Sequence, residues 1–154
     1  MPSSGLWFIW ALAIYAILAK AFRPWAGPAL AVATAISVAT FAGLLPLTSF
    51  AHHNALAYAP FFLAGAWYGA PAVAWLGQRP LQVLLVGTGL SATLLAALQG
   101  LDGVAFGIGR TALSAVALAA ASAMAVYASR IPPLRRSLSY FGRNSLPIYV
   151  GHTP

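Results

Sequence analysis

The sequence contains no cysteine, and Asp102 is its only carboxylate side chain. The lack of cysteine excludes a disulfide framework, a thiolate nucleophile and a zinc–thiolate site. A single carboxylate leaves the chain poorly supplied for paired-carboxylate catalysis, for a carboxylate proton relay and for a nucleophile–histidine–carboxylate triad. We therefore expect neither thiol chemistry nor chemistry that depends on pairs of acids.

Charge of either sign is also scarce, because 6% of the 154 residues are charged and 61% are hydrophobic. Soluble domains are roughly one-quarter charged, so this composition predicts an integral membrane protein. The net charge of +7 does not indicate nucleic-acid binding, because apolar runs separate the basic residues instead of leaving them on one face. The first five residues lack the basic segment of a secretory signal, so we expect the first apolar segment to be a retained span.

Apolar segments of a length close to the roughly 20 residues of a spanning helix follow one another along the chain. They cover residues 6–22, 30–45, 58–76, 81–98 and 108–129, with Pro71 expected to kink the third. Residues 48–57 are predicted to form an uncharged polar loop, and a further apolar run from Ser145 supplies about half of a sixth span. The predicted fold is all-α, a polytopic transmembrane helical bundle of five spans plus a truncated sixth.

Basic residues are concentrated in alternate connections between these spans. The intervening connections contribute only Arg110, whereas the remaining basic residues are Lys20, Arg23, Arg79, Arg130, Arg135, Arg136 and Arg143. The positive-inside rule then predicts a multi-pass protein of the inner or plasma membrane. The same rule puts the N-terminus, His52, His53 and Asp102 on the outside.

Several polar or small residues near these spans have two interpretations. His52 and His53 point about 100° apart on a helix and cannot chelate as an i, i+4 pair, so they are either loop histidines without a special role or part of an outer acceptor-binding site. Arg110 either snorkels to the outer interface or lines a cavity and holds an anion. Gly65 and Gly69 form a G-x-x-x-G motif, which favours helix packing within the chain or a dimer face.

A polar stripe is expected near the end of the chain. Ser145, Tyr149 and His152 are spaced by four and three residues, so a helix that starts after Asn144 would align them on one face. Polar groups on a membrane helix should face inward, where they could form the wall of a site or make hydrogen bonds between helices.

Residues 140–152, reading YFGRNSLPIYVGH, resemble the closing motif of the membrane acyltransferase 3 family, G-x-x-S-x-x-I-Y-x-x-H. Two weaker resemblances lie in the same order along the chain: residues 6–10 (LWFIW) and residues 60–66 (PFFLAGA) are similar to earlier spans of that family. The residues that match family motifs are Trp7, Phe8, Arg143, Asn144, Ser145, Tyr149 and His152.

The resemblance implies an integral membrane enzyme that transfers an acyl group, usually acetyl, from cytoplasmic acyl-CoA to a hydroxyl of a carbohydrate or similar acceptor. A histidine would act as general base, and basic side chains would hold the phosphates of acyl-CoA. Arg135 and Arg136 are candidates for those phosphate contacts, with a purely topogenic loop as the alternative. His152 is a candidate for an auxiliary contact.

The family's catalytic histidine lies in its first span, and no segment here resembles that span. Residues 1–154 are thus expected to be the C-terminal half of the acyltransferase domain, inactive alone, with no catalytic residue assigned, no bound cofactor and no metal. The alternatives are a small non-enzymatic membrane protein that packs against a partner, or a transporter subunit. Asp102, the only acidic residue available for ion coupling, lies in a predicted turn, which disfavours the transporter.

Overall fold

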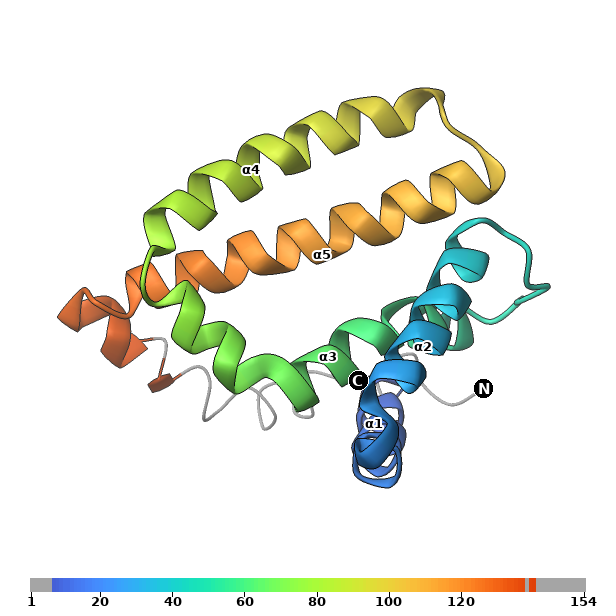
Figure 1. The fold of residues 1–154 in the computed structure, drawn as a ribbon, viewed down its shortest axis with the longest axis horizontal. Coiled ribbons are helices and arrows are strands. Elements are labelled where there is room, and N and C mark those ends of the chain that lie inside the picture. Colours follow the sequence, from blue (N-terminus) through green and yellow to red (C-terminus); the bar gives the residue numbers. More distant parts are fainter. Residues whose placement is uncertain (1–6, 138, 141–154) are drawn as a thin grey trace, which may run out of the picture.

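The computed structural model describes residues 7–137 and 139–140, and this part of the chain is helical without strands. Figure 1 shows the helices in order. The α-helices are α1 (Trp7–Ala21), α2 (Ala26–Phe41), α3 (Phe50–Leu76), α4 (Pro80–Ala97) and α5 (Gly103–Ala128). Two short 3-10 helices, Arg23–Trp25 and Leu98–Gly100, lie before α2 and after α4. The prediction of an all-α fold is confirmed.

The helices have the character of membrane spans. Among the described residues, three helical stretches are long and apolar enough to cross a membrane: Arg23–Phe41, Pro80–Gly100 and Gly103–Ala128. A shorter apolar helix covers Phe8–Ala21. α3 is not among the three, and its central and C-terminal part contains two prolines and two glycines together with tyrosine and tryptophan, which are less apolar than the aliphatic residues of the other spans. Each predicted span overlaps one of α1 to α5, and the run from Ser145 lies outside the described residues.

The predicted polar loop over residues 48–57 is wrong, because α3 already begins at Phe50. His52, His53 and Asn54 therefore lie in the first turns of a helix. The segment contains no glycine or proline that would stop a helix, and the Asn54 Nδ2 donates a hydrogen bond to the Phe50 carbonyl at 2.9 Å. Polarity alone was a poor guide here, because a polar first turn at a membrane surface remains helical.

The predicted boundaries of two other spans shift by several residues. α2 begins at Ala26 and ends at Phe41, where Gly43 follows with a φ of 70° that favours glycine. α5 begins at Gly103, five residues before the predicted start, with Asp102 at the N-cap position. Pro60 and Pro71 lie inside α3, which curves along its length in Figure 1, as helices do where proline removes a backbone hydrogen bond.

The helices pack in a chain of neighbours. α4 and α5 form an antiparallel hairpin (Figure 1), α5 also contacts α2 and α3, α2 contacts α3, and α1 contacts α3. At the end of the hairpin where α4 begins, the Arg130 Nη2 donates a hydrogen bond to the Gly77 carbonyl at 2.5 Å. The turn before α4 and the residues after α5 therefore lie at the same end, as the charge pattern predicts.

Small residues allow the closest contacts between helices. A Cβ at Gly107 of α5 would collide with the Val38 carbonyl of α2, and a Cβ at Gly87 of α4 would lie 2.9 Å from the Ala120 Cβ of α5. Neither pair was predicted. Within the part of the chain that the structure describes, a Cβ at Gly65 or Gly69 would meet no atom within 4 Å, so this motif makes no helix contact there.

Candidate functional site

Three helices bring polar and aromatic side chains together around Phe41, the last residue of α2. The Phe41 ring lies 6.2 Å from the His53 ring and 5.9 Å from the Tyr58 ring, centroid to centroid, at interplanar angles of 76° and 78°. The Arg110 Cζ of α5 lies 6.0 Å from the Phe41 ring centroid. We call Phe41, His53, Tyr58 and Arg110 the Phe41 cluster.

Two buried hydroxyl groups, those of Ser37 and Thr111, lie where the three helices meet, close to this cluster. Ser37, which is 0% exposed, donates a hydrogen bond from its Oγ to the Ala57 carbonyl of α3 at 2.6 Å. Its Oγ also lies 3.4 Å from the Thr111 Oγ1 of α5, which in turn donates to the Gly107 carbonyl at 2.9 Å. Ser37 precedes Phe41 by one helical turn, so its bond to α3 helps to position Phe41 beside His53 and Tyr58, and Thr111 follows Arg110 directly on α5.

The Arg110 side chain is half-buried and positively charged. Among the described residues, no hydrogen bond or ion pair engages its guanidinium, and its contact is with the Phe41 ring. Asp102 is eight residues upstream, about 12 Å along a helix axis, and forms no salt bridge with Arg110. The cation–π contact stabilises the charge but uses none of the guanidinium N–H donors, which radiate in its plane.

The adjacent histidines point to different neighbours. The His52 ring packs edge-on against Trp10 of α1, with centroids 5.9 Å apart at 76°, while the His53 ring faces Phe41 of α2. The prediction that two adjacent helical histidines diverge is therefore confirmed. One histidine belongs to the Phe41 cluster, and the other lies at the edge of a groove.

This groove, the α1–α2–α3 groove, has a volume of about 620 Å³ and almost entirely apolar walls. Its walls include Trp10, Phe22, Ile36, Leu56 and Trp67, with His52 among the lining residues. Two of the polar side-chain atoms in its walls are occupied elsewhere, because the Tyr15 hydroxyl donates to the Ala55 carbonyl and the Trp67 Nε1 donates to the Ala19 carbonyl at 2.9 Å. The groove can therefore accept an apolar chain but offers little polar chemistry.

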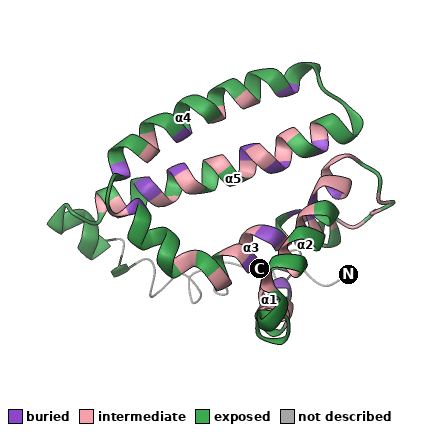
Figure 2. Cartoon of the chain, in the orientation of Figure 1, coloured by how far each residue is buried: buried purple, intermediate pink, exposed green. Residues whose placement is uncertain are grey.

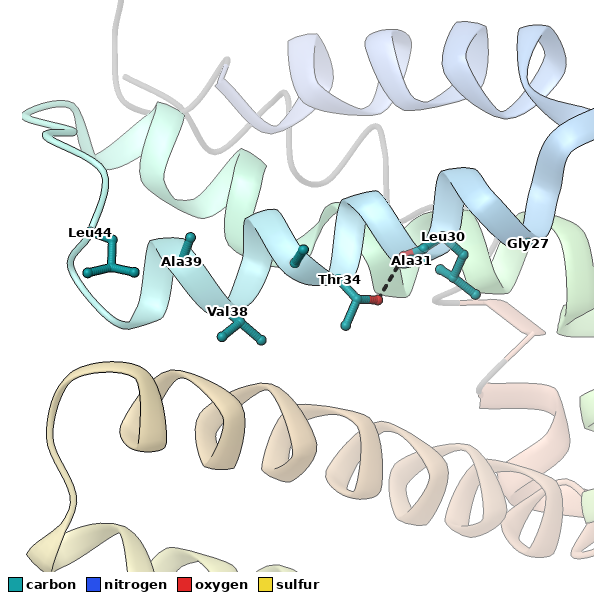
Figure 3. A pocket seen from close by; sticks show the side chains of 8 residues that line it. Gly27, Leu30, Ala31, Thr34, Val38, Ala39 and Leu44 are labelled. Atoms are coloured by element: carbon teal, nitrogen blue, oxygen red, sulfur yellow. Dashed lines mark hydrogen bonds between the residues drawn. The ribbon is translucent and has the colours of Figure 1, made fainter.

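A second pocket, of about 730 Å³, runs along α2 and is shown in Figure 3. Its lining is Gly27, Leu30, Ala31, Thr34, Ala35, Val38, Ala39 and Leu44. The hydroxyl of Thr34 donates to the Leu30 carbonyl at 2.8 Å within the same helix. No ionisable side chain lines this pocket, so we do not assign chemistry to it.

The sequence of the whole chain, residues 1–154, matches the family model described as an acyltransferase domain of type 3. The chain belongs to the acyltransferase 3 family. It is also similar to the inner membrane protein YcfT of Escherichia coli (strain K12), with 29% identity over 80 residues. That alignment covers 52% of this chain and 22% of YcfT, so the match spans less than a quarter of that relative's length. No solved structure matches the chain significantly.

The acyltransferase 3 motif residues fall partly within the described structure. Trp7 and Phe8 form the start of α1, where the Phe8 side chain is exposed. The other predicted motif residues, Arg143, Asn144, Ser145, Tyr149 and His152, lie outside the described residues. Arg135 and Arg136 are exposed and lie in a helical stretch, residues 132–137, that follows α5.

The Phe41 cluster was not predicted as a unit, although His53 and Arg110 were each singled out. Phe41 and Tyr58 were missed because an aromatic residue at the end of an apolar segment is typical of any membrane span. A signal was available for Tyr58, which begins the third apolar segment four residues after the polar residues 52–54, whereas Phe41 lies inside the second apolar segment and carries no such signal.

Proposed function

We propose that this chain forms part of a membrane enzyme that transfers an acyl group, such as acetyl, from acyl-CoA to a hydroxyl of a carbohydrate-like acceptor. The observation that carries the proposal is the match of residues 1–154 to the acyltransferase 3 family. The similarity to an inner membrane protein supports the inner membrane as its location. The charge pattern supports a multi-pass arrangement with the N-terminus outside.

The donor would bind at the end of the bundle where α5 terminates. Arg135 and Arg136 are exposed there, close in sequence to Arg130, which contacts the turn before α4. Guanidinium groups bind phosphate oxygens through paired hydrogen bonds, and coenzyme A carries three phosphate groups. By the positive-inside rule this end faces the cytoplasm, where acyl-CoA is available.

The acceptor would bind at the opposite end of α5, which begins near the Phe41 cluster. In the reaction, the acceptor oxygen forms a bond to the acyl carbon while the carbon–sulfur bond breaks, the hydroxyl proton passes to a base, and the thiol of coenzyme A is released. We assign no residue of this chain as that base. The resemblance puts it on a histidine of a first span that has no counterpart in residues 1–154.

The donor site can be tested by calorimetry on the purified chain in detergent. We expect acetyl-CoA to bind, and the double variant R135Q/R136Q to bind it roughly tenfold or more weakly, since hydrogen bonds to charged groups contribute about 1.5–3 kcal/mol each. S-acetylpantetheine lacks the phosphates, so its affinity should differ much less between the unchanged protein and the double variant. If acetyl-CoA does not bind, either to the chain alone or to the chain co-expressed with the N-terminal half of a relative, the result would count against the proposed acyltransferase function.

A non-enzymatic membrane protein is the second candidate. Gly65 and Gly69 leave one face of α3 open among the described residues, and Figure 2 shows α4 exposed along most of its length. Both surfaces could pack against a partner helix. This function predicts association with a membrane partner and no affinity for acyl-CoA, so the same calorimetry separates the two candidates.

A further inference from the structure

We propose that the Phe41 cluster binds an oxyanion, either a phosphate ester or a carboxylate, and that Arg110 is the residue that contacts it. The inference that this oxyanion is part of the acceptor rests on the proposed function. The anion site itself rests on the geometry of α2, α3 and α5. The inferred substrate class is therefore an acidic carbohydrate or a carbohydrate that carries a phosphate.

The charge of Arg110 is the first observation. A half-buried guanidinium is costly unless it is paired with an opposite charge or fully hydrogen-bonded. Across residues 7–137 and 139–140, no acceptor engages it, and the only carboxylate of the chain, Asp102, lies about two helical turns away. A bound anion would supply the acceptor oxygens that the described residues do not.

The orientation of Arg110 is the second observation. A snorkelling arginine extends its head group into water, whereas the Arg110 Cζ lies 6.0 Å from the Phe41 ring centroid. This contact holds the guanidinium beside a junction of three helices, and the buried hydrogen bond from Ser37 to the Ala57 carbonyl ties α2 to α3 in that junction. The donors of Arg110 are therefore held near one place, as recognition of a planar carboxylate or a phosphate requires.

The neighbouring groups are the third observation. His53 and Tyr58 lie edge-on to the same Phe41 ring and can each donate a hydrogen bond, and Tyr58 is exposed. The cluster has three side chains with N–H or O–H donors and contains no acid that would repel an anion. Its exposed aromatic ring offers an apolar surface next to these donors, a combination that suits a sugar bearing an acidic group.

Binding of small probes to the 154-residue chain in phosphatidylcholine nanodiscs tests the proposal. The probes are glucose 1-phosphate and glucuronate, with glucose as the neutral control. We expect both anions to bind, glucose to bind at least tenfold more weakly, and R110Q to lose roughly tenfold or more in affinity for the anions. R110K should retain part of the affinity, because it keeps the charge but loses the planar donor fork.

Arg79→Gln is the matched control, because it removes one positive charge from an exposed arginine at the other end of α5. It should bind the anions as the unchanged protein does. The proposal would be overturned if R110Q bound the anions as tightly as the unchanged protein does, or if R79Q lost as much affinity as R110Q. It would also be overturned if the unchanged protein bound glucose as tightly as the anions. Circular dichroism of R110K and R110Q establishes that both variants are folded before binding is compared.

A phosphate could also come from a membrane lipid, so a second arm uses nanodiscs that contain phosphatidylglycerol. If the acceptor is the ligand, glucose 1-phosphate should still bind in these nanodiscs, in an Arg110-dependent manner. Retention of phosphatidylglycerol through Arg110, without any binding of the sugar anions, would overturn the assignment to the acceptor. Because neither arm uses acyl-CoA, a failure of the donor test leaves these results unaffected.

Discussion

Ser37 joins α2 to α3 through one hydroxyl group. Its Oγ donates to the Ala57 carbonyl of α3 and lies 3.4 Å from the Thr111 Oγ1 of α5. Each hydroxyl has one proton, and Thr111 donates its own to Gly107, so the bond from Ser37 to Ala57 is the one that links α2 to α3.

We predict that Ser37→Ala lowers the free energy of unfolding by about 1 kcal/mol, because it removes a buried interhelical hydrogen bond. Thermal unfolding in detergent, followed by circular dichroism, measures the change. Ser114→Ala is the matched control, since the Ser114 hydroxyl donates to the Arg110 carbonyl within its own helix. Equal stability changes in the two variants would show that the Ser37 bond does not join the helices.

Phe41 and Arg110 should be energetically coupled. We predict that a double-mutant cycle with Phe41→Leu and Arg110→Gln gives a coupling free energy of about 0.5–2 kcal/mol, because each variant alone removes the cation–π contact. Chemical unfolding in detergent provides the four free energies. Additive changes would mean that the ring and the guanidinium are near each other without interacting.

At the scale of the helices, the crossing of α2 and α5 depends on one glycine. A Cβ at Gly107 would overlap the Val38 carbonyl and lie 3.0 Å from the Ala42 Cβ. We predict that Gly107→Val destabilises the protein by roughly 1–3 kcal/mol, since larger side chains in a close contact force the backbones apart. Thermal unfolding and the yield of folded protein are the measurements.

Gly65→Val is the control for that variant, because the space around Gly65 is open among the described residues. Both substitutions replace a helical glycine with the same branched side chain, so the contribution of helix propensity is similar. A loss of stability in Gly65→Val as large as in Gly107→Val would mean that the α2–α5 crossing is not the cause.

The sequence was a good guide to which segments are helices and a weaker guide to their ends. Long apolar runs must form helices in a membrane, because no other structure within one segment satisfies the backbone there. The start of α3 was misjudged because His52, His53 and Asn54 made residues 48–57 resemble a loop. Polar residues indicate where a segment meets water, but they do not indicate where the helix begins.

At the scale of the whole molecule, the neighbours of each helix were beyond prediction. Hydropathy identifies α2, α4 and α5 as long enough and apolar enough to span a membrane, but it does not say that Gly107 lets α5 cross α2 beside Phe41. The Phe41 cluster combines residues 41, 53, 58 and 110, and this grouping depends on that crossing. The charges of the connections, in contrast, can be read directly from the sequence. They predict that the connections containing Arg79 and Arg130 lie at the same end of the bundle, and the hydrogen bond from Arg130 to the Gly77 carbonyl agrees with this prediction.

The proposed transfer of an acyl group from a cytoplasmic donor to an acceptor outside requires the Phe41 cluster and the arginine-rich end to face opposite compartments. The absence of cysteine makes this directly measurable, because a single introduced cysteine is the only thiol in the chain. Asp102→Cys reports on the end near the cluster, and Gln78→Cys and Ser137→Cys report on the other end. In intact cells, a membrane-impermeant maleimide should label position 102 and should label positions 78 and 137 only after lysis. Labelling of position 78 or 137 from outside, or protection of position 102, would contradict the account.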